Sequence, residues 1–475
     1  GVNEFVLCAS AYQPWIDKYP GSTAGGKHYC LNRNNTYWEY SRPFWDYQAR
    51  CSALMRKGVP VVDICVYLGQ NPPVKLVTYR LPEIPEGYDF DVCTAEALVG
   101  RTMAVDGRLT LPTGISYSLL VIQRNNDMPL HVLRHIAGLV KGGVIVCGPR
   151  PDGSDSLKDK AESEEYRALV DELWGELTTV SQIRKVGKGK IYENIPLSEV
   201  LKYENIRPDI AIKSGNTAKD KVYFVHRRLS DADVYFLNNH SDRAFHDTIR
   251  LRTDARQAEY WDAVTGQRYM IPVKASGEKG MLLNLTLAPR ESGFIVTSNN
   301  QATGLLPRIA DVQETITPIE GSWNVYFDPR WGGPGKVVFD ELIDWTVHAD
   351  TGIRYYSGTA VYHKELNLAM PAQNERLLLR FPRLGSLARV WVNGKEVVTV
   401  WCSPWEADIT SYVHEGKNNL KIEVVNSLMN RMIGDASLPE SERFTYAYPQ
   451  IATPTDKLVP SGIMEQLNLV YRQCQ

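Results

Sequence analysis

The hydrophobic and polar positions of residues 59–205 alternate between short continuous apolar runs and helical spacings. Residues 61–68 are almost uninterruptedly apolar, a pattern typical of a strand in a parallel sheet that is covered on both faces. The pattern predicts, in chain order, strands at 61–68 and 118–122, a helix at 130–140, a strand at 144–147 and a helix at 162–174. Strands that alternate with helices in this way favour a doubly wound, flavodoxin-like α/β domain.

The first 58 residues combine one strand, a long loop and one helix. An apolar run at 5–8 predicts a buried strand, and Pro43 fits the first turn of a helix that ends before Gly58. Between them, residues 12–36 are rich in Gly, Pro, Asn and aromatic residues. Loops of more than ~12–15 residues in compact domains are usually functional or disordered. The aromatic content argues against a plain linker, so we expect a functional loop.

Beyond residue 205 the pattern changes to a period of two. Residues 222–225 and 293–296 are examples of such strands, with turn residues between them, and they predict an antiparallel β-sandwich over 206–300. Residues 301–475 form a second all-β unit, in which Asn393-Gly394 is the strongest short hairpin signal. The chain is therefore expected to be multidomain, with α/β and all-β parts.

Composition narrows the possible partners. The 475 residues suffice for about three domains. The formal charge of −2 gives no basic footprint, so nucleic acid and anionic membranes are not expected partners. No apolar run reaches the ~18 residues of a membrane-spanning helix. The 11 Trp and 25 Tyr side chains suit stacking on sugar rings, although burial in cores explains them as well.

Several kinds of site are disfavoured by spacing. The eight cysteines contain no C-x-x-C pair, which excludes zinc ribbons and thioredoxin motifs, and their even number permits disulfides without requiring them. The α/β region has no G-x-G-x-x-G fingerprint for a dinucleotide. His131 and His135 lie one helical turn apart, but no third metal ligand accompanies them.

Three motifs follow one another within residues 388–420. Residues 388–395 read Ala-Arg-Val-Trp-Val-Asn-Gly-Lys, residues 404–410 read Pro-Trp-Glu-Ala-Asp-Ile-Thr, and residues 416–420 read Gly-Lys-Asn-Asn-Leu. In this order they resemble the sugar-binding domain of family 2 glycosidases. The resemblance implies a galactose-binding-like jelly roll over 301–475. Such domains either bind sugar or only brace a catalytic barrel, and the motifs leave both roles open.

A wider set of motifs extends over nearly the whole chain. It consists of residues 1–6, Tyr12-Gln13-Pro14-Trp15, Asp344-Trp345-Thr346, residues 355–362, residues 430–435 and residues 460–463. Together these resemble the C-terminal portion of the glycoside hydrolase family 106 α-L-rhamnosidases. The resemblance implies inverting hydrolysis of α-L-rhamnosides, calcium as the cofactor, and a (β/α)8 barrel of which residues 1–58 are the C-terminal end.

The same resemblance sets expectations about substrate and surroundings. The substrate is an oligo- or polysaccharide that contains α-L-rhamnose, such as pectic rhamnogalacturonan, and the compartment is the bacterial periplasm or the extracellular space. The general acid belongs to an earlier barrel strand, so an N-terminal segment is expected to complete the barrel, and this chain alone is expected to be inactive. The family pattern has a histidine where Cys8 stands.

A catalytic carboxylate of this chain should lie within residues 1–58. Inverting glycosidases use two carboxyl groups ~6.5–9.5 Å apart, and barrel chemistry occurs at the C-terminal ends of the strands. Glu4 starts a strand and Asp46 lies inside the helix, whereas Glu39 ends the long loop beside aromatic residues. Glu39 is therefore the candidate general base. The same residue can instead stabilise the N-terminus of the following helix, and the sequence leaves both roles open.

The candidates for substrate binding lie in the same loop. They are Tyr12, Gln13, Trp15, Asp17, His28, Arg33 and Trp38. Aromatic rings stack on sugars, Asp17 suits a sugar hydroxyl, and Arg33 suits hydroxyls or a uronate carboxylate. A lone loop histidine such as His28 also serves structural roles. No set of metal ligands can be identified from the sequence.

Two other interpretations stay open. The chain can be a non-catalytic carbohydrate-binding or bracing fragment, or it can be a relative of the family 2 β-galactosidases that shares the sandwich modules. Hydrolysis of rhamnosides, binding without hydrolysis and hydrolysis of β-galactosides distinguish the three.

Overall fold

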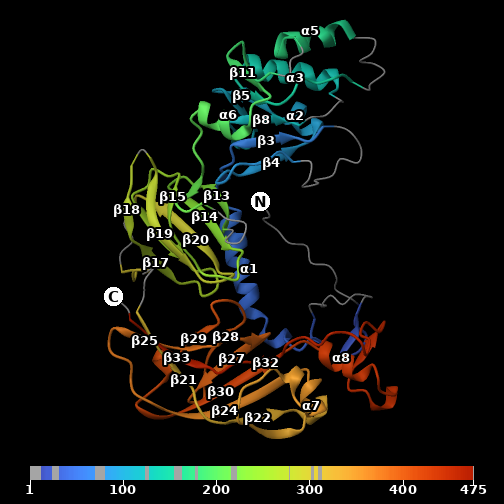
Figure 1. Cartoon of the computed structure of the whole chain (residues 1–475), viewed down its shortest axis with the longest axis vertical. Coiled ribbons are helices and arrows are strands. Elements are labelled where there is room, and N and C mark those ends of the chain that lie inside the picture. Colours follow the sequence, from blue (N-terminus) through green and yellow to red (C-terminus); the bar gives the residue numbers. More distant parts are fainter. Residues whose placement is uncertain are drawn as a thin grey trace.

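The computed structural model describes residues 12–23, 32–69, 81–123, 128–154, 163–176, 180–215, 222–277, 279–300, 304–308 and 313–473. Figure 1 shows a group of helices and strands, a group of antiparallel strands beside it, and a larger group of strands formed by the C-terminal residues. Taken together, these ranges contain more strands than helices. The chain is therefore a mostly β, multidomain protein, which confirms the expected combination of α/β and all-β parts at this level.

A six-stranded sheet lies at the centre of the α/β unit (Figure 1). Its order is β10 (Gln182–Val186), β11 (Gly189–Glu193), β9 (Ile145–Cys147), β8 (Leu119–Ile122), β3 (Ile64–Tyr67) and β4 (Phe90–Cys93). Neighbouring strands are parallel except for the edge pair β10 and β11. Ile64 and Val66 of β3 enter one core and Cys65 enters another. Because both faces of this strand are covered, its sequence is continuously apolar.

The helices of this unit are α2 (Ala95–Arg101), α3 (Leu130–Lys141), α5 (Ser163–Trp174) and α6 (Leu197–Tyr203). Leu133, Ile136 and Val140 of α3 are buried, which confirms the helical spacing read from the sequence. A small antiparallel sheet of β5 (Met103–Val105), β6 (Arg108–Thr110) and β7 (Ser116–Tyr117) was not predicted. None of the helices in the described ranges is long and apolar enough to cross a membrane.

Two antiparallel sheets surround one core in the central β unit. The first has the order β12 (Ile210–Ile212), β15 (Phe245–Leu251), β19 (Met281–Leu287) and β18 (Val273–Ala275). The second has the order β17 (Arg268–Ile271), β16 (Gln257–Trp261), β20 (Ser292–Ser298), β14 (Ala232–Asn239), β13 (Val222–Arg228) and β2 (Val59–Pro60). Because β2 pairs with β13, residues 59–60 join this sheet and not the strand that follows them.

The C-terminal unit also contains two antiparallel sheets around one core. One has the order β21 (Glu314–Pro318), β33 (Asn468–Gln473), β25 (Glu375–Arg380) and β29 (Glu406–Asp408). The other has the order β23 (Gly335–Phe339), β22 (Trp323–Phe327), β24 (Thr359–Leu368), β30 (Gly416–Val425), β27 (Leu387–Val392) and β28 (Lys395–Val400). Asn393 and Gly394 have φ values of 49° and 79°, so the predicted hairpin turn between β27 and β28 is confirmed.

Short elements complete the C-terminal unit. They are β26 (Leu384–Gly385), which pairs with β32 (Gly462–Ile463), the helices α7 (Thr351–Arg354) and α8 (Met429–Asp435), and β31 (Tyr446–Tyr448), which pairs with β1 (Pro20–Ser22). The pairing of β1 with β31 joins the first described residues to the last part of the chain.

Helix α1 (Arg42–Met55) runs between the two β units (Figure 1). It begins at the predicted proline turn and ends before Gly58. Phe44 meets Trp401 of the C-terminal unit edge-on, with 5.7 Å between ring centroids. Leu54 packs on the small apolar cluster under β14 and β20. The helix therefore contacts both units, and it is more than the end of a loop.

Candidate functional site

Most of the predicted site residues lie on two stretches, 12–23 and 32–41, which we call the aromatic loop. The loop lies against the C-terminal unit, because its strand β1 pairs in parallel with β31. The hydroxyl of Thr36 adds a hydrogen bond to the carbonyl of Asn426 at 2.5 Å, across 390 positions of sequence. The aromatic loop is therefore positioned by tertiary contacts.

Gln13 and Arg33 brace the aromatic loop itself. Gln13 Nε2 donates to the carbonyl of Pro20 at 2.8 Å, and its Oε1 accepts from the N–H of Ser22 at 3.0 Å. The guanidinium of Arg33 donates to the carbonyls of Gln13 and Trp15 at 3.3 and 3.4 Å. Both side chains thus hold the loop in shape, and their predicted contact with substrate stays a prediction.

Trp15 belongs to a small aromatic cluster on the C-terminal unit. Its half-buried ring meets Tyr446 edge-on, with 5.0 Å between centroids. Lys18 Nζ lies over both rings, 4.1 Å from the centroid of Tyr446 and 5.5 Å from that of Trp15. This cation–π arrangement fixes the ring of Trp15, so its face is held at one orientation.

Three other predicted residues point outward. The ring of Tyr12 is 85% exposed, the ring of Trp38 is at the edge of exposure with 36%, and Asp17 is exposed. These side chains are accessible to a ligand in solution. The seventh predicted substrate-binding residue, His28, lies outside the residues that the structure describes.

Glu39 lies in a single 3-10 turn, Trp38–Tyr40, directly before α1. Its side chain is exposed, whereas its carbonyl accepts a hydrogen bond from Arg389 at 2.8 Å. Within the described residues no side chain caps α1, whose N-cap residue is Ser41 and whose first turn contains no acidic residue. The backbone of Glu39 is therefore fixed by the C-terminal unit, while its carboxylate is free to meet a ligand.

Tyr40 and Arg389 were missed at the sequence level. The Arg389 guanidinium lies 4.1 Å from the ring centroid of Tyr40. The Tyr40 hydroxyl lies 3.2 Å from Oγ1 of Thr359 and 3.3 Å from a carboxylate oxygen of Glu423. Burial raises the pKa of Tyr40, and the nearby Glu423 carboxylate adds to this effect. Arg389 stands within the quoted 388–395 motif, but nothing in that motif indicates a partner 350 positions away.

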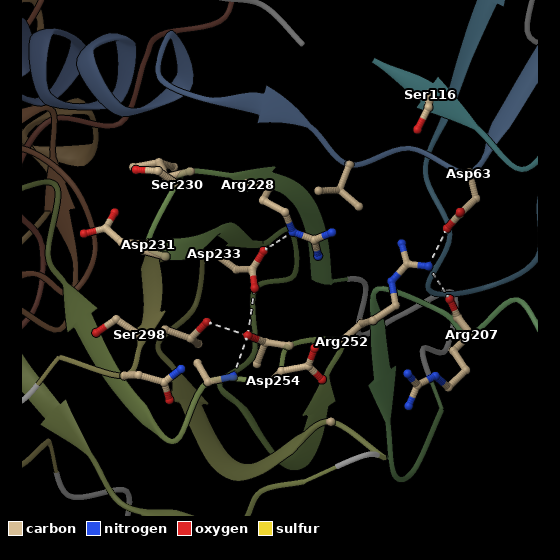
Figure 2. A pocket seen from close by; sticks show the side chains of 18 of the residues that line it. Asp63, Ser116, Arg207, Arg228, Ser230, Asp231, Asp233, Arg252, Asp254 and Ser298 are labelled. Atoms are coloured by element: carbon tan, nitrogen blue, oxygen red, sulfur yellow. Dashed lines mark hydrogen bonds and ion pairs between the residues drawn. The ribbon is translucent and has the colours of Figure 1, made fainter. Parts of the chain in front are cut away.

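A second candidate site is a pocket of about 650 Å³ where the α/β unit meets the central β unit (Figure 2). Its walls come from the connection before β3, the turn between β13 and β14, the residues after β15 and the end of β20. Arg108 of β6 and Ser116 of β7 close one side. We call this space the junction pocket.

A buried network of charges forms the base of the junction pocket. The ring of His226 is fully buried, with Nδ1 2.7 Å from Asp209 and Nε2 3.0 Å from Asp233. Arg252 lies 2.6 Å from Asp209 and 2.7 Å from Asp63. Buried charges are tolerated only when they are paired in this way. The network therefore joins the start of β3 to the central β unit.

The network stabilises the ionised form of Asp233, as the direction of its pKa shift indicates. Burial alone would raise the pKa of Asp233, but hydrogen bonds from His226, Thr253 and Arg228 lower it to about 2. The carboxylate is therefore ionised over the whole ordinary pH range. One signal in the sequence could have indicated this network: Asp63 is a charged residue inside an otherwise apolar run.

The described residues contain no evident cluster of metal ligands. Across the described ranges, no group of three or more His, Cys, Asp or Glu side chains could hold a metal ion. The calcium ion implied by the resemblance stays a prediction. Cys51, Cys65, Cys93, Cys147 and Cys402 are free thiols.

Two protein families match the chain. A family model described as alpha-L-rhamnosidase, of glycoside hydrolase family 106, matches residues 1–274. A model described as the sugar binding domain of glycosyl hydrolases family 2 matches residues 310–471. The first match includes the aromatic loop and the junction pocket, except for the wall after residue 274, and the second coincides with the C-terminal unit.

A solved rhamnosidase structure agrees with the first match, and other relatives carry other names. A rhamnosidase structure from Novosphingobium sp. PP1Y has a TM-score of 0.88 and 29% identity, and the match covers 99% of this chain and 44% of that one. A curated protein of Formosa agariphila named putative beta-glucuronidase is 22% identical, over 92% of this chain and 56% of its own length. A beta-glucuronidase structure from Ruminococcus gnavus has a TM-score of 0.26 and 21% identity, covering 35% of this chain and 29% of that one. The chain thus spans about half the length of the first two relatives.

Proposed function

This chain belongs to the glycoside hydrolase family 106 α-L-rhamnosidases, and from this premise we propose that it forms part of an enzyme that hydrolyses α-L-rhamnosides. The observation that carries the proposal is the match of 99% of the chain to a rhamnosidase structure with a TM-score of 0.88. Because the chain spans 44% of that relative, the activity is assigned to the whole enzyme. The proposed substrate is rhamnose-containing polysaccharide such as rhamnogalacturonan, outside the cytoplasm.

The proposed division of labour follows the four regions. Residues 1–58 are assigned to the end of a (β/α)8 catalytic barrel, and the three units that follow are assigned as a doubly wound α/β domain, a β-sandwich and a jelly roll. The strand orders given above and the family 2 match over residues 310–471 support the last three assignments, and the barrel end rests on the family match over residues 1–274. A preceding segment is expected to supply the other barrel strands and the general acid.

Glu39 is the proposed general base. In inverting hydrolysis one carboxylate removes a proton from water as the water oxygen attacks the anomeric carbon, while a carboxylic acid protonates the leaving oxygen. Three observations support Glu39: its carboxylate is exposed, its backbone is held by Arg389 at 2.8 Å, and the accessible ring of Trp38 precedes it. A base must be held within hydrogen-bond reach of the water, so a fixed backbone favours this role.

The test compares hydrolysis of p-nitrophenyl α-L-rhamnoside by this chain and by a form extended upstream. We expect activity only in the extended form, and a loss of about 10²–10⁴-fold in kcat/KM for Glu39→Gln. Asp46→Asn is the matched control, since Asp46 lies in α1 with only a 3.8 Å ion pair to Arg42. Unchanged kcat/KM in Glu39→Gln would remove Glu39 from the mechanism while leaving the family assignment intact.

A specific observation favours a second candidate, a carbohydrate-binding or bracing role without catalysis. Gln13 and Arg33 direct polar groups to the backbone of the aromatic loop itself, so both side chains have a structural role that needs no catalysis. If neither form hydrolyses the rhamnoside but the chain binds rhamnogalacturonan in a titration, this second function applies. Activity on β-galactosides has no observation in its favour beyond the shared sugar-binding module.

A further inference from the structure

The junction pocket has the dimensions of a ligand site and lies away from the aromatic loop. Its volume of about 650 Å³ falls within the ~300–1,000 Å³ typical of small-molecule pockets. The α/β unit and the central β unit both contribute walls (Figure 2). A molecule bound there would contact both units at once.

The polar groups at the base of the pocket are held in place by their neighbours. Asp63 is ion-paired with Arg252 at 2.7 Å and with Arg108 at 3.6 Å. Arg228 Nε donates to Asp233 at 2.9 Å, while its side chain remains 51% exposed. Figure 2 shows Arg228 and Arg252 reaching toward these carboxylates. The site is therefore preorganised, and among the described residues Arg228 keeps terminal N–H donors for a ligand.

The rim adds two carboxylates that have no partner in the described part of the chain. The carboxylates of Asp231 and Asp254 are exposed, and neither makes a hydrogen bond or ion pair there. Ser230 and Ser298 add hydroxyl groups to the same rim (Figure 2). The lining thus offers both donors and acceptors, and a ligand that both donates and accepts is complementary to it.

The lining also limits the charge and shape of the ligand. Four arginines and four aspartates line the pocket, so its formal charge is zero. This balance gives no preference to an anion over a neutral molecule. No aromatic side chain is among the described lining residues, so the site would bind through hydroxyl groups and not through ring stacking.

We propose that the junction pocket is a secondary, non-catalytic binding site for a short neutral oligosaccharide of about two sugar units. The choice of a sugar over another polyol rests on the proposed function. Bound there, the sugar would hold a branch of the polysaccharide on the enzyme while the catalytic region acts elsewhere. The two units would also be clamped together by their common ligand.

The test is calorimetric titration of this chain with three probes: rutinose and lactose as neutral disaccharides, and digalacturonic acid as an anionic one. We expect a neutral disaccharide to bind with a Kd of about 1 mM. Ser230→Trp, which fills the exposed rim, should raise that Kd at least about tenfold. Asp231→Asn together with Asp254→Asn should raise it about three- to tenfold, because two acceptors lose their charge.

Ser322→Trp is the matched control, because Ser322 is exposed in the C-terminal unit and should leave the Kd unchanged. Circular dichroism verifies that each variant is folded. The proposal is overturned if no probe binds, if Ser230→Trp binds as the unaltered chain does, or if digalacturonic acid binds more tightly than both neutral probes. Since no hydrolysis is measured, loss of the proposed rhamnosidase activity in the extended enzyme would leave this result standing, and the reverse also holds.

Discussion

Gly462, part of the motif at residues 460–463, lies where no side chain fits. Its φ is +94°, and a Cβ at this position would lie 2.3 Å from Nε1 of Trp345. That nitrogen donates to the hydroxyl of Tyr362 at 2.7 Å, and both aromatic residues are fully buried. The glycine therefore allows β32 to approach the core of the C-terminal unit. Two separate motifs, at 344–346 and 460–463, meet at this contact.

Gly462→Ala is expected to destabilise the C-terminal unit by about 3 kcal/mol, because overpacking adds to the cost of a left-handed backbone. The measurement is the denaturation midpoint followed by tryptophan fluorescence. Gly335→Ala is the control: its φ is +83°, but nothing lies within 4 Å of the added Cβ. We expect that change to cost about 1 kcal/mol. Equal losses in both variants would mean that the contact with Trp345 is unimportant.

Asp233 provides a second test at the scale of single residues, through pH. Its pKa falls from an ordinary value of 3.8 to about 2 in the folded chain. A carboxylate whose pKa is lower in the folded than in the unfolded chain stabilises the fold at pH values above its unfolded-state pKa. This contribution is lost as the pH falls toward the folded-state pKa. The stabilisation of about 2 kcal/mol is therefore complete above pH ~4 and disappears near pH ~2.

Asp233→Asn should accordingly lower the stability of the central β unit by about 2 kcal/mol at pH 7, with a difference that shrinks between pH ~4 and pH ~2. Urea midpoints at several pH values measure this. Asp231→Asn, two residues away and exposed, should show no such dependence. A pH-independent difference for Asp233→Asn would contradict the role assigned to its charge.

Among the elements, α1 differs most between what the sequence indicates and what the structure shows. The sequence predicts its boundaries, but only the tertiary contacts show that it lies between two β units. Arg50 donates to the carbonyls of Ala263 and Val264 at 3.0 and 2.9 Å. The hydroxyl of Tyr47 lies 2.8 Å from that of Ser292. The helix thus carries the aromatic loop on a rigid support.

Leu54→Ala should weaken this support, since Leu54 packs under β14 and β20. A partly buried leucine is expected to contribute about 2 kcal/mol. Amide hydrogen exchange along α1 should become faster, with little change in the α/β unit. Ala53→Ser, on the exposed face of the same turn, is the control. Unchanged exchange in Leu54→Ala would show that α1 is held from the C-terminal unit alone.

At the scale of the whole molecule, one arginine connects the α/β unit to the central β unit. The side chains of Asp63 and Asp209 are almost completely buried, and Arg252 lies within 2.7 Å of both. The chain crosses between the units twice near this point, before β3 and before β12. Removing the cation leaves two buried carboxylates without their common partner.

Arg252→Met is therefore expected to cost about 3–5 kcal/mol and to loosen the α/β unit from its neighbour. Limited proteolysis should cut faster near residues 59–63 and 206–209, and small-angle scattering should give a larger radius of gyration. Arg250→Met is the control, because among the described residues that side chain makes a single, long hydrogen bond of 3.4 Å to the carbonyl of Lys279. Equal cleavage rates in both variants would contradict the role of Arg252 as the connection.

The sequence alone determined the elements whose period is imposed by burial. Three features follow from local rules: the apolar run at 61–68, the spacing of Leu133 and Ile136, and the Asn393-Gly394 turn. The first two follow from the direction in which successive side chains point, and the third from the backbone angles that the turn requires. The family resemblance was also available from motifs, and the family match over residues 1–274 confirms it. Strand β3, at Ile64–Tyr67 within 61–68, is shorter than its apolar run, because Asp63 is used in the charged network.

Only the tertiary structure decided how the candidate sites are assembled. Arg389 donates a hydrogen bond to Glu39 across 350 positions. The network around His226 joins Asp63, at the start of the α/β unit in the sequence, to Asp209, which follows that unit. No periodicity encodes such pairs, because their energy depends on the distance between groups that come together only after folding. The loop residues show the same limit: the sequence predicts Gln13 and Arg33 as ligands of a sugar, and only the fold reveals the hydrogen bonds from both side chains to the backbone of the loop itself.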